Sequence, residues 1–131
     1  MIARTIRQRV LVVEDEPSVA DALKIVLSDN CYEVAVALTG QEGLDKATRQ
    51  KFDVTITDLR LPDMSGLEVI TTMRERYPNT LVIVITAHYT PEVAAESIRR
   101  GAVAVLAKPF NPSDILNLLH RALSEKGPHT R

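Results

Sequence analysis

Residues 54–66, VTITDLRLPDMSG, decide the fold, because in them a short apolar run ends on a carboxylate and gives way to a turn. The run Val54–Thr57 is rich in β-branched residues and nearly continuous, which is typical of a strand buried on both faces of a parallel sheet. Ser65 and Glu68 have the spacing of a capping box, which marks the start of a helix. The stretch therefore predicts a buried strand that carries Asp58 at its carboxyl end, followed by a loop and a helix.

The same alternation of strand and helix extends over the rest of the chain. Three more apolar runs predict buried strands, at Val10–Val13, Leu81–Ile85 and Val103–Ala107. A partly alternating run, Tyr32–Val36, fits a strand at the edge of the sheet. Helical spacing fills the gaps, with starts at Pro17, at Thr39 with Glu42, at Thr90-Pro91 and at Asn111-Pro112, and with stops at Gly101 and Gly127-Pro128. Strict alternation predicts an α/β fold, a doubly wound five-stranded parallel sheet with helices on both faces.

Composition excludes several other classes of protein. The chain has 131 residues, 16 Lys+Arg against 17 Asp+Glu and 45% hydrophobic residues, which fits one folded domain and not a disordered chain. Cys31 has no second cysteine to pair with, so a disulfide scaffold is excluded, and we expect a buried or half-buried thiol. No apolar run reaches the roughly 18 residues of a membrane span, and the N-terminus lacks a signal-peptide core, so we expect a cytoplasmic protein without membrane contact. The near-neutral charge argues against direct nucleic-acid binding by this domain.

Charged and hydroxyl side chains fall at the carboxyl ends of four predicted strands, where ligands bind in open α/β sheets. They are Glu14, Asp15, Asp58, Thr86 and Lys108. The edge strand ends in Ala37-Leu38-Thr39, with nothing ionisable. We therefore expect one site at this rim of the sheet, formed without the edge strand.

The residue types of this set point to phosphoryl chemistry. Crowded carboxylates repel one another and favour a divalent cation with hard oxygen ligands. No histidine and no second cysteine lies in the set, which favours magnesium over zinc or copper. A lysine and a threonine hydroxyl suit the remaining oxygens of a phosphoryl group. Asp58 is the best candidate nucleophile, because the Glu14-Asp15 pair has the character of a metal cradle.

At this point a resemblance becomes specific. The stretch Thr57–Gly66 resembles the phosphoacceptor motif of response-regulator receiver domains, as in the chemotaxis receiver of two-component signalling. Val12–Glu16 resembles their acidic pair, Ile85–Ala87 their switch hydroxyl and Lys108–Phe110 their lysine. The match runs in the expected order over residues 8–125, which we expect to form the receiver domain, with 1–7 as an N-terminal extension and 126–131 as a tail or the start of a linker.

The resemblance implies a fold and a role for each residue of the site. It implies the flavodoxin-like strand order 2-1-3-4-5. It implies that Asp58 accepts a phosphoryl group from a sensor histidine kinase or a phosphotransfer protein, in a self-catalysed reaction and not as a conventional enzyme. Mg²⁺, for which Mn²⁺ can substitute, would be held by Asp15, Asp58 and the backbone carbonyl of Arg60, with Glu14 acting mostly through water. Thr86 and Lys108 would bind phosphoryl oxygens.

The resemblance also concerns the output. It implies a cis Lys108-Pro109 bond and a homodimer or partner surface formed by the fourth helix, fifth strand and fifth helix. Family members commonly carry an aromatic residue where this chain has Val105, so the mode of output stays open, with Tyr89 as a candidate substitute. Arg60 and His88, two residues beyond Asp58 and Thr86, are placed to tune dephosphorylation.

Three other hypotheses stand beside this one. A phosphatase with an aspartyl nucleophile needs a second carboxylate two residues after it, where this chain has Arg60. A degenerate receiver would serve only as an interaction module, against which the full set of site residues argues. The chain could also be the receiver portion of a larger DNA-binding or ATPase transcriptional regulator.

Overall fold

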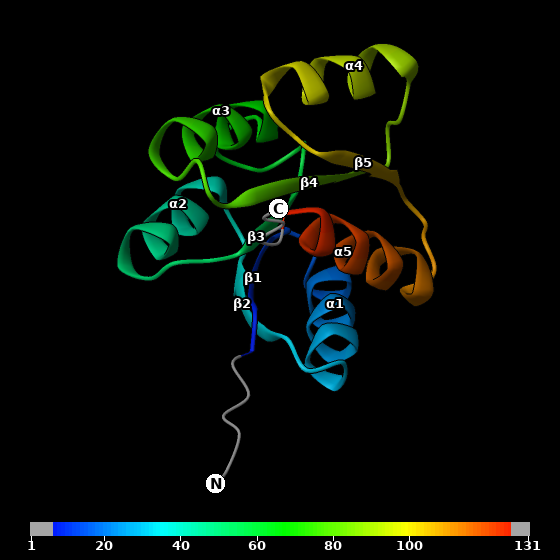
Figure 1. The fold of residues 1–131 in the computed structure, drawn as a ribbon. Helices are drawn as coiled ribbons and strands as arrows, with labels where there is room; N and C mark the ends of the chain where they lie inside the picture. Colours follow the sequence, from blue (N-terminus) through cyan, green and yellow to red (C-terminus); the bar gives the residue numbers. More distant parts are fainter. Residues whose placement is uncertain (1–6, 127–131) are drawn as a thin grey trace, which may run out of the picture.

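Strands and helices alternate strictly along the chain in the computed structural model, which describes residues 7–126. The strands are β1 (Arg9–Val13), β2 (Glu33–Ala37), β3 (Val54–Asp58), β4 (Leu81–Thr86) and β5 (Ala104–Ala107). The helices are α1 (Pro17–Asp29), α2 (Gly40–Arg49), α3 (Gly66–Arg76), α4 (Pro91–Arg100) and α5 (Pro112–Lys126). All ten elements predicted from the sequence are present (Figure 1). Residues 1–6 and 127–131, which hold most of the predicted extension and tail and the Gly127-Pro128 helix stop, lie outside the described residues.

The five strands form one parallel sheet in the order β2-β1-β3-β4-β5, which confirms the expected topology. The order reverses at β1, because the chain adds β2 on one side of β1 and then crosses to β3 on the other. Such a reversal opens a crevice at the carboxyl ends of the strands. The crevice here lies at the ends of β1 and β3, where Glu14 and Asp15 follow β1 and Asp58 is the last residue of β3.

Two apolar layers cover the faces of the sheet, and the strand sequences divide between them. In β1, Val10 and Val12 face the layer with α1 and α5, whereas Leu11 and Val13 face the layer with α2 and α3. Figure 1 shows α1 and α5 together on one side of the sheet. Because both faces are covered, strand residues are buried on both sides and are mostly apolar, with Thr55 and Thr57 of β3 as polar exceptions, and this explains the nearly continuous apolar runs in the sequence.

The predicted helix starts are present, with one difference in detail. Thr39 and Thr90 accept hydrogen bonds from the backbone N–H groups of Glu42 and Val93, as N-caps should. Ser65 also caps its helix, but it accepts from Leu67 N, and Glu68 returns no bond among the described residues. The predicted capping box at Ser65 is therefore half right: the helix begins where expected, with one bond of the two.

Cys31 corrects the expectation of a buried thiol. It follows α1 with a positive φ of 70°, and its side chain is exposed. The left-handed turn that leads the chain from α1 into β2 directs this side chain to solvent, so local backbone geometry outweighs the general preference of cysteine for the interior. Among residues 7–126, no helix has the length and apolar character needed to cross a membrane.

Candidate functional site

The five side chains predicted to meet at one rim do so. Glu14 and Asp15 follow β1, Asp58 and Thr86 are the last residues of β3 and β4, and Lys108 follows β5. One carboxylate oxygen from each of Glu14, Asp15 and Asp58 lies within 4.8 Å of the others. Glu14 is buried, Asp58 is 7% exposed and Asp15 is exposed, so the cluster has a buried floor and an open side.

Lys108 is the cation of the site. Its Nζ lies 2.8 Å from Glu14 Oε1, 3.0 Å from Asp58 Oδ2 and 3.6 Å from Glu16 Oε1, with only 12% of the side chain exposed. Burial on its own would lower the pKa of Lys108, but the close ion pairs with Glu14 and Asp58 outweigh it and raise the pKa above its ordinary value. Lys108 is therefore held protonated, facing more negative charge than it can neutralise.

Within the cluster, the Glu14 carboxylate has the least compensation for its burial. Burial raises its pKa, and the attraction of Lys108 only partly opposes that effect. Its Oε2 accepts a hydrogen bond from Glu16 N at 3.1 Å, whereas Oε1 has the nearby ammonium but no well-aligned donor among the described residues. A buried carboxylate oxygen without an aligned donor, beside two further carboxylates, fits a hard divalent cation that takes oxygen ligands.

The remaining polar groups line the same crevice. Asp58 Oδ1 accepts a long hydrogen bond, 3.3 Å, from Arg60 N at the start of the β3–α3 loop. The hydroxyl of Thr86 is nearly inaccessible and accepts from His88 N at 3.0 Å. Its backbone carbonyl accepts from Lys108 N at 2.8 Å, so the ends of β4 and β5 are joined at the site. The peptide bond Lys108-Pro109 is cis, as the resemblance implied.

The β3–α3 loop returns very close to Asp58. Gly66 N donates to Leu59 O at 2.8 Å, and Arg60 and Ser65 form an antiparallel bridge across the loop. A Cβ atom on Gly66 would lie 2.2 Å from the carbonyl oxygen of Asp58. Only glycine allows this approach, and it fixes the loop beside the carboxylate.

Sequence reasoning missed one residue of this region, Asp63. Its two carboxylate oxygens accept from Gly40 N and Gln41 N, at the start of α2. Nothing in the local pattern distinguishes Asp63 from an ordinary turn residue, because its partners are more than twenty positions away in the sequence. The edge strand thus contributes to the region after all, through the backbone N–H groups that follow it and not through side chains.

The positions named for output and dephosphorylation are also placed. Val105 is half-buried and packs on the core layer that contains α3, whereas Tyr89 lies 48% exposed in the β4–α4 loop. Arg60 and His88 are exposed at the rim. Tyr89 therefore has a different environment from Val105 and does not fill its place in the core.

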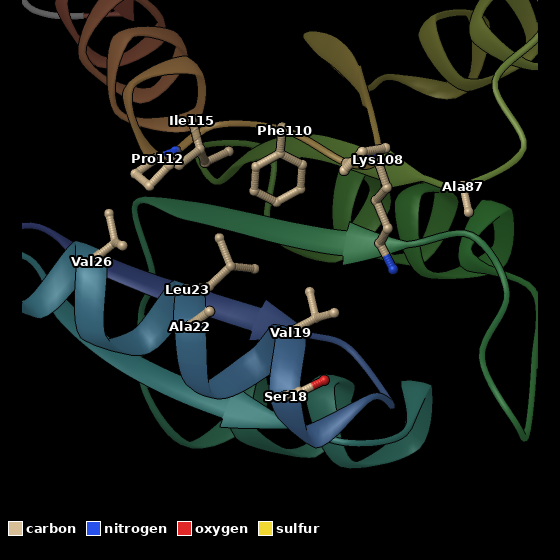
Figure 2. Close-up of a pocket in the computed structure, with 11 residues that line it drawn as sticks. Ser18, Val19, Ala22, Leu23, Val26, Ala87, Lys108, Phe110, Pro112 and Ile115 are labelled. Atoms are coloured by element: carbon tan, nitrogen blue, oxygen red, sulfur yellow. The ribbon is translucent and has the colours of Figure 1, made fainter.

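An apolar pocket of about 480 Å³ adjoins the charged rim. Figure 2 shows Val19, Leu23 and Val26 of α1 on one side, with Phe110 and Ile115 on the other. Lys108, which is ion-paired to Glu14 and Asp58, lies at one end together with Ala87. The site therefore combines a polar crevice with an apolar groove between α1 and the start of α5.

The chain is similar to known proteins over most of its length. A profile of the family described as "Response regulator receiver domain" matches residues 10–120. The response regulator protein PilR of Pseudomonas aeruginosa is 34% identical over 122 residues, which cover 93% of this chain and 27% of PilR. The chain spans about a quarter to a half of the length of the curated relatives that it matches.

Solved structures are similar over nearly their whole length. A CheY-like response regulator receiver domain protein from Methanospirillum hungatei superposes with a TM-score of 0.89 at 33% identity, covering 92% of this chain and 97% of that one. The beryllofluoride-activated NtrC4 receiver domain dimer gives a TM-score of 0.87 at 34% identity, covering 91% and 98%.

Proposed function

The chain belongs to the response regulator receiver domain family, and from this we propose that it accepts a phosphoryl group on Asp58. The observation that carries the proposal is the meeting of three carboxylates, a hydroxyl and an ammonium from four strands at one rim. Receiver domains are not conventional enzymes, which is consistent with the transfer of one phosphoryl group to the protein itself.

The chemistry required of Asp58 is nucleophilic displacement at phosphorus. A carboxylate oxygen of Asp58 attacks the phosphorus of a phosphohistidine, the P–N bond breaks, and the leaving imidazole takes up a proton. The product is an acyl phosphate, which water later hydrolyses to inorganic phosphate and the free carboxylate. No other side chain forms a covalent bond in this transfer, so positioning of the reactants and neutralisation of charge supply most of the rate acceleration.

Mg²⁺ is the cation that we propose for the cluster, and Mn²⁺ would be accepted in its place. Asp15, Asp58 and the backbone carbonyl of Arg60 would hold it, and Glu14 would contribute through water. The bound ion would neutralise charge on the transferred phosphoryl oxygens. The unaligned buried oxygen of Glu14 and the open side at Asp15 support this assignment.

Lys108 and Thr86 have matching roles toward the phosphoryl group. The Lys108 ammonium already lies 3.0 Å from Asp58 Oδ2, where it would bind an oxygen of the acyl phosphate. The Thr86 hydroxyl is bound to His88 N, and turning toward the phosphoryl group would exchange that partner. We propose that this exchange biases the β4–α4 loop and the α4–β5–α5 face between two arrangements.

A donor protein has to bring its phosphohistidine to this rim. The apolar groove between α1 and the β5–α5 loop opens next to Lys108 and supports that region as the contact area for a sensor histidine kinase or a phosphotransfer protein. Transfer from such a kinase also implies a cytoplasmic location, where its ATP is available. The α4–β5–α5 face is the proposed partner or homodimer surface, and the NtrC4 receiver provides a relative that forms a dimer.

The longer relatives bear on the output that such a receiver could serve. PilR is a much longer chain, and AlgB and GlrR, also longer, are described as transcriptional regulators. The second candidate is therefore the receiver portion of a transcriptional regulator, with residues 8–125 as the receiver unit.

Phosphorylation by phosphoramidate tests the proposal without the cognate kinase. With Mg²⁺, the protein should gain one phosphoryl group by intact mass. Hydroxylamine should remove that group, because it cleaves an acyl phosphate and leaves a phosphate ester of serine or threonine intact. Chelation of Mg²⁺ and Asp58→Asn should each prevent uptake. Equal uptake by Asp58→Asn would overturn the assignment.

A further inference from the structure

The β3–α3 loop, residues 59–65, is held at its base and at its tip by contacts of different kinds. Its base is closed by the bond from Gly66 N to Leu59 O and by the Arg60–Ser65 bridge. Its tip is held by Asp63, whose Oδ1 accepts from Gly40 N at 2.8 Å and whose Oδ2 accepts from Gln41 N at 2.9 Å. Both oxygens of one carboxylate are thus used to attach this loop to α2.

The start of α2 is itself a fixed point. Thr39 Oγ1 accepts from Glu42 N at 3.0 Å, and Glu42 Oε1 accepts from Leu38 N at 2.8 Å. One residue earlier, Ala37 O accepts from Glu14 N at 2.9 Å. A continuous series of short contacts therefore runs from Asp63 through the β2–α2 loop to Glu14, on the opposite side of the crevice.

Close packing reinforces the attachment. The Met64 side chain covers Gly40 so closely that a Cβ atom there would lie 2.5 Å from Met64 Cγ. The bonds from Gln41 and Gly40 lower the pKa of Asp63, so its carboxylate stays charged near neutral pH. A charged carboxylate at a helix N-terminus makes stronger hydrogen bonds than a neutral acceptor.

We propose that Asp63 is a positioning residue for the metal and phosphoryl site, acting through the backbone of the loop. Asp63 lies outside the carboxylate cluster of Glu14, Asp15 and Asp58, so we do not propose it as a ligand of the ion. Its effect passes to Arg60, three positions away, because the Arg60–Ser65 bridge closes the short loop that contains both Arg60 and Asp63. The inference rests on the proposed function, in which the Arg60 carbonyl is a ligand.

A merely structural role predicts a different result. If Asp63 only stabilised α2, its loss would lower the stability of the fold and leave Mg²⁺ affinity unchanged. Asp53 provides a matched control, because its Oδ2 accepts from Arg9 N at 2.8 Å at the far end of the sheet. Asp53→Ala removes a carboxylate-to-backbone bond of the same kind, distant from the site.

The experiment compares Asp63→Ala, Asp63→Asn and Asp53→Ala by calorimetric titration with MgCl₂, by thermal unfolding and by phosphoramidate labelling. We expect Asp63→Ala to bind Mg²⁺ about three- to tenfold more weakly than the wild type, in line with the loss of charge-assisted bonds. Asp63→Asn keeps one acceptor oxygen, so its Mg²⁺ affinity should lie between those of Asp63→Ala and the wild type. Asp53→Ala removes one such bond, so it should lose some thermal stability and keep wild-type Mg²⁺ affinity. Amide exchange at Gly40 and Gln41 should accelerate in Asp63→Ala and stay at the wild-type rate in Asp53→Ala.

The outcomes separate this inference from the proposed function. Unchanged Mg²⁺ affinity in both Asp63 variants overturns the positioning role, and if Asp63→Ala does not fold, the Mg²⁺ affinity of Asp63→Asn decides the question. A labelling rate that saturating Mg²⁺ restores locates the defect in ion binding and supports the role. A wild-type protein that binds Mg²⁺ but takes up no phosphoryl group overturns the proposed function, and the affinity comparison still decides the role of Asp63.

Discussion

Asp15→Asn should make the Mg²⁺-free protein more stable while removing its response to Mg²⁺. Asp15 is exposed and forms no ion pair among the described residues, yet one of its oxygens lies within 4.8 Å of oxygens on Glu14 and Asp58. At 4.8 Å, two like charges repel by about 0.9 kcal/mol in water and about 3.5 kcal/mol at an effective dielectric constant of 20. Asp15 faces solvent, so the lower end of this range applies to each of its two interactions.

We therefore expect a gain of about 1–2 kcal/mol in the free energy of unfolding without Mg²⁺. For 131 residues, this gain corresponds to a rise of about 4–7 °C in the unfolding midpoint. In the wild type, Mg²⁺ at one hundred times its dissociation constant should add about 2.7 kcal/mol, or about 10 °C. The variant should lose most of this second increase, because one proposed ligand is gone.

Thermal unfolding followed by circular dichroism, with EDTA or with Mg²⁺, measures both effects. Asp21→Asn is the matched control, since Asp21 is an exposed carboxylate of α1 outside the cluster, and it should change neither quantity. High salt should shrink the gain of Asp15→Asn, because exposed charges are then screened. A variant that is less stable than the wild type in EDTA, or that still gains fully from Mg²⁺, would refute the reasoning.

Three further predictions concern the same site. Lys108→Met should cost about 3–5 kcal/mol in EDTA, since it leaves the buried Glu14 without its cation, and urea unfolding that shows no loss would contradict the ion-pair geometry. In EDTA, the stability of the wild type should fall as pH rises from 4.5 through the raised pKa of Glu14, because the native state retains a proton that the unfolded chain has released. Urea unfolding at several pH values measures this slope, and Glu14→Gln should flatten it. Gly66→Ala should destabilise the fold by about 1–3 kcal/mol through contact with the Asp58 carbonyl, and an unchanged unfolding midpoint would show that the loop can withdraw.

The fold was accessible from the sequence for a physical reason. Strands covered on both faces are apolar at most positions, so the runs Val10–Val13 and Leu81–Ile85 can be recognised in the sequence. Parallel strands all end at the same rim, and for that reason the positions of Asp58 and Lys108 at strand ends were enough to bring them together.

Contacts between distant loops were not accessible in this way. The bonds of Asp63 to Gly40 and Gln41 depend on how the β3–α3 loop folds over α2, and no local pattern encodes them. The single bond of Ser65 and the exposure of Cys31 likewise follow from backbone angles that propensities do not specify. The residues at strand ends could be predicted from the sequence, whereas the contacts that hold the loops around the site could not.

The most direct test of the central claim is to locate the phosphoryl group. Borohydride reduces an aspartyl phosphate to homoserine, which peptide mass spectrometry can assign to one position. After treatment with phosphoramidate and Mg²⁺, we expect homoserine at position 58 alone, and none when Mg²⁺ is chelated. Conversion at Asp15 or Asp63, or no conversion in a protein that has bound Mg²⁺, would contradict the assignment of Asp58 as the phosphoryl acceptor.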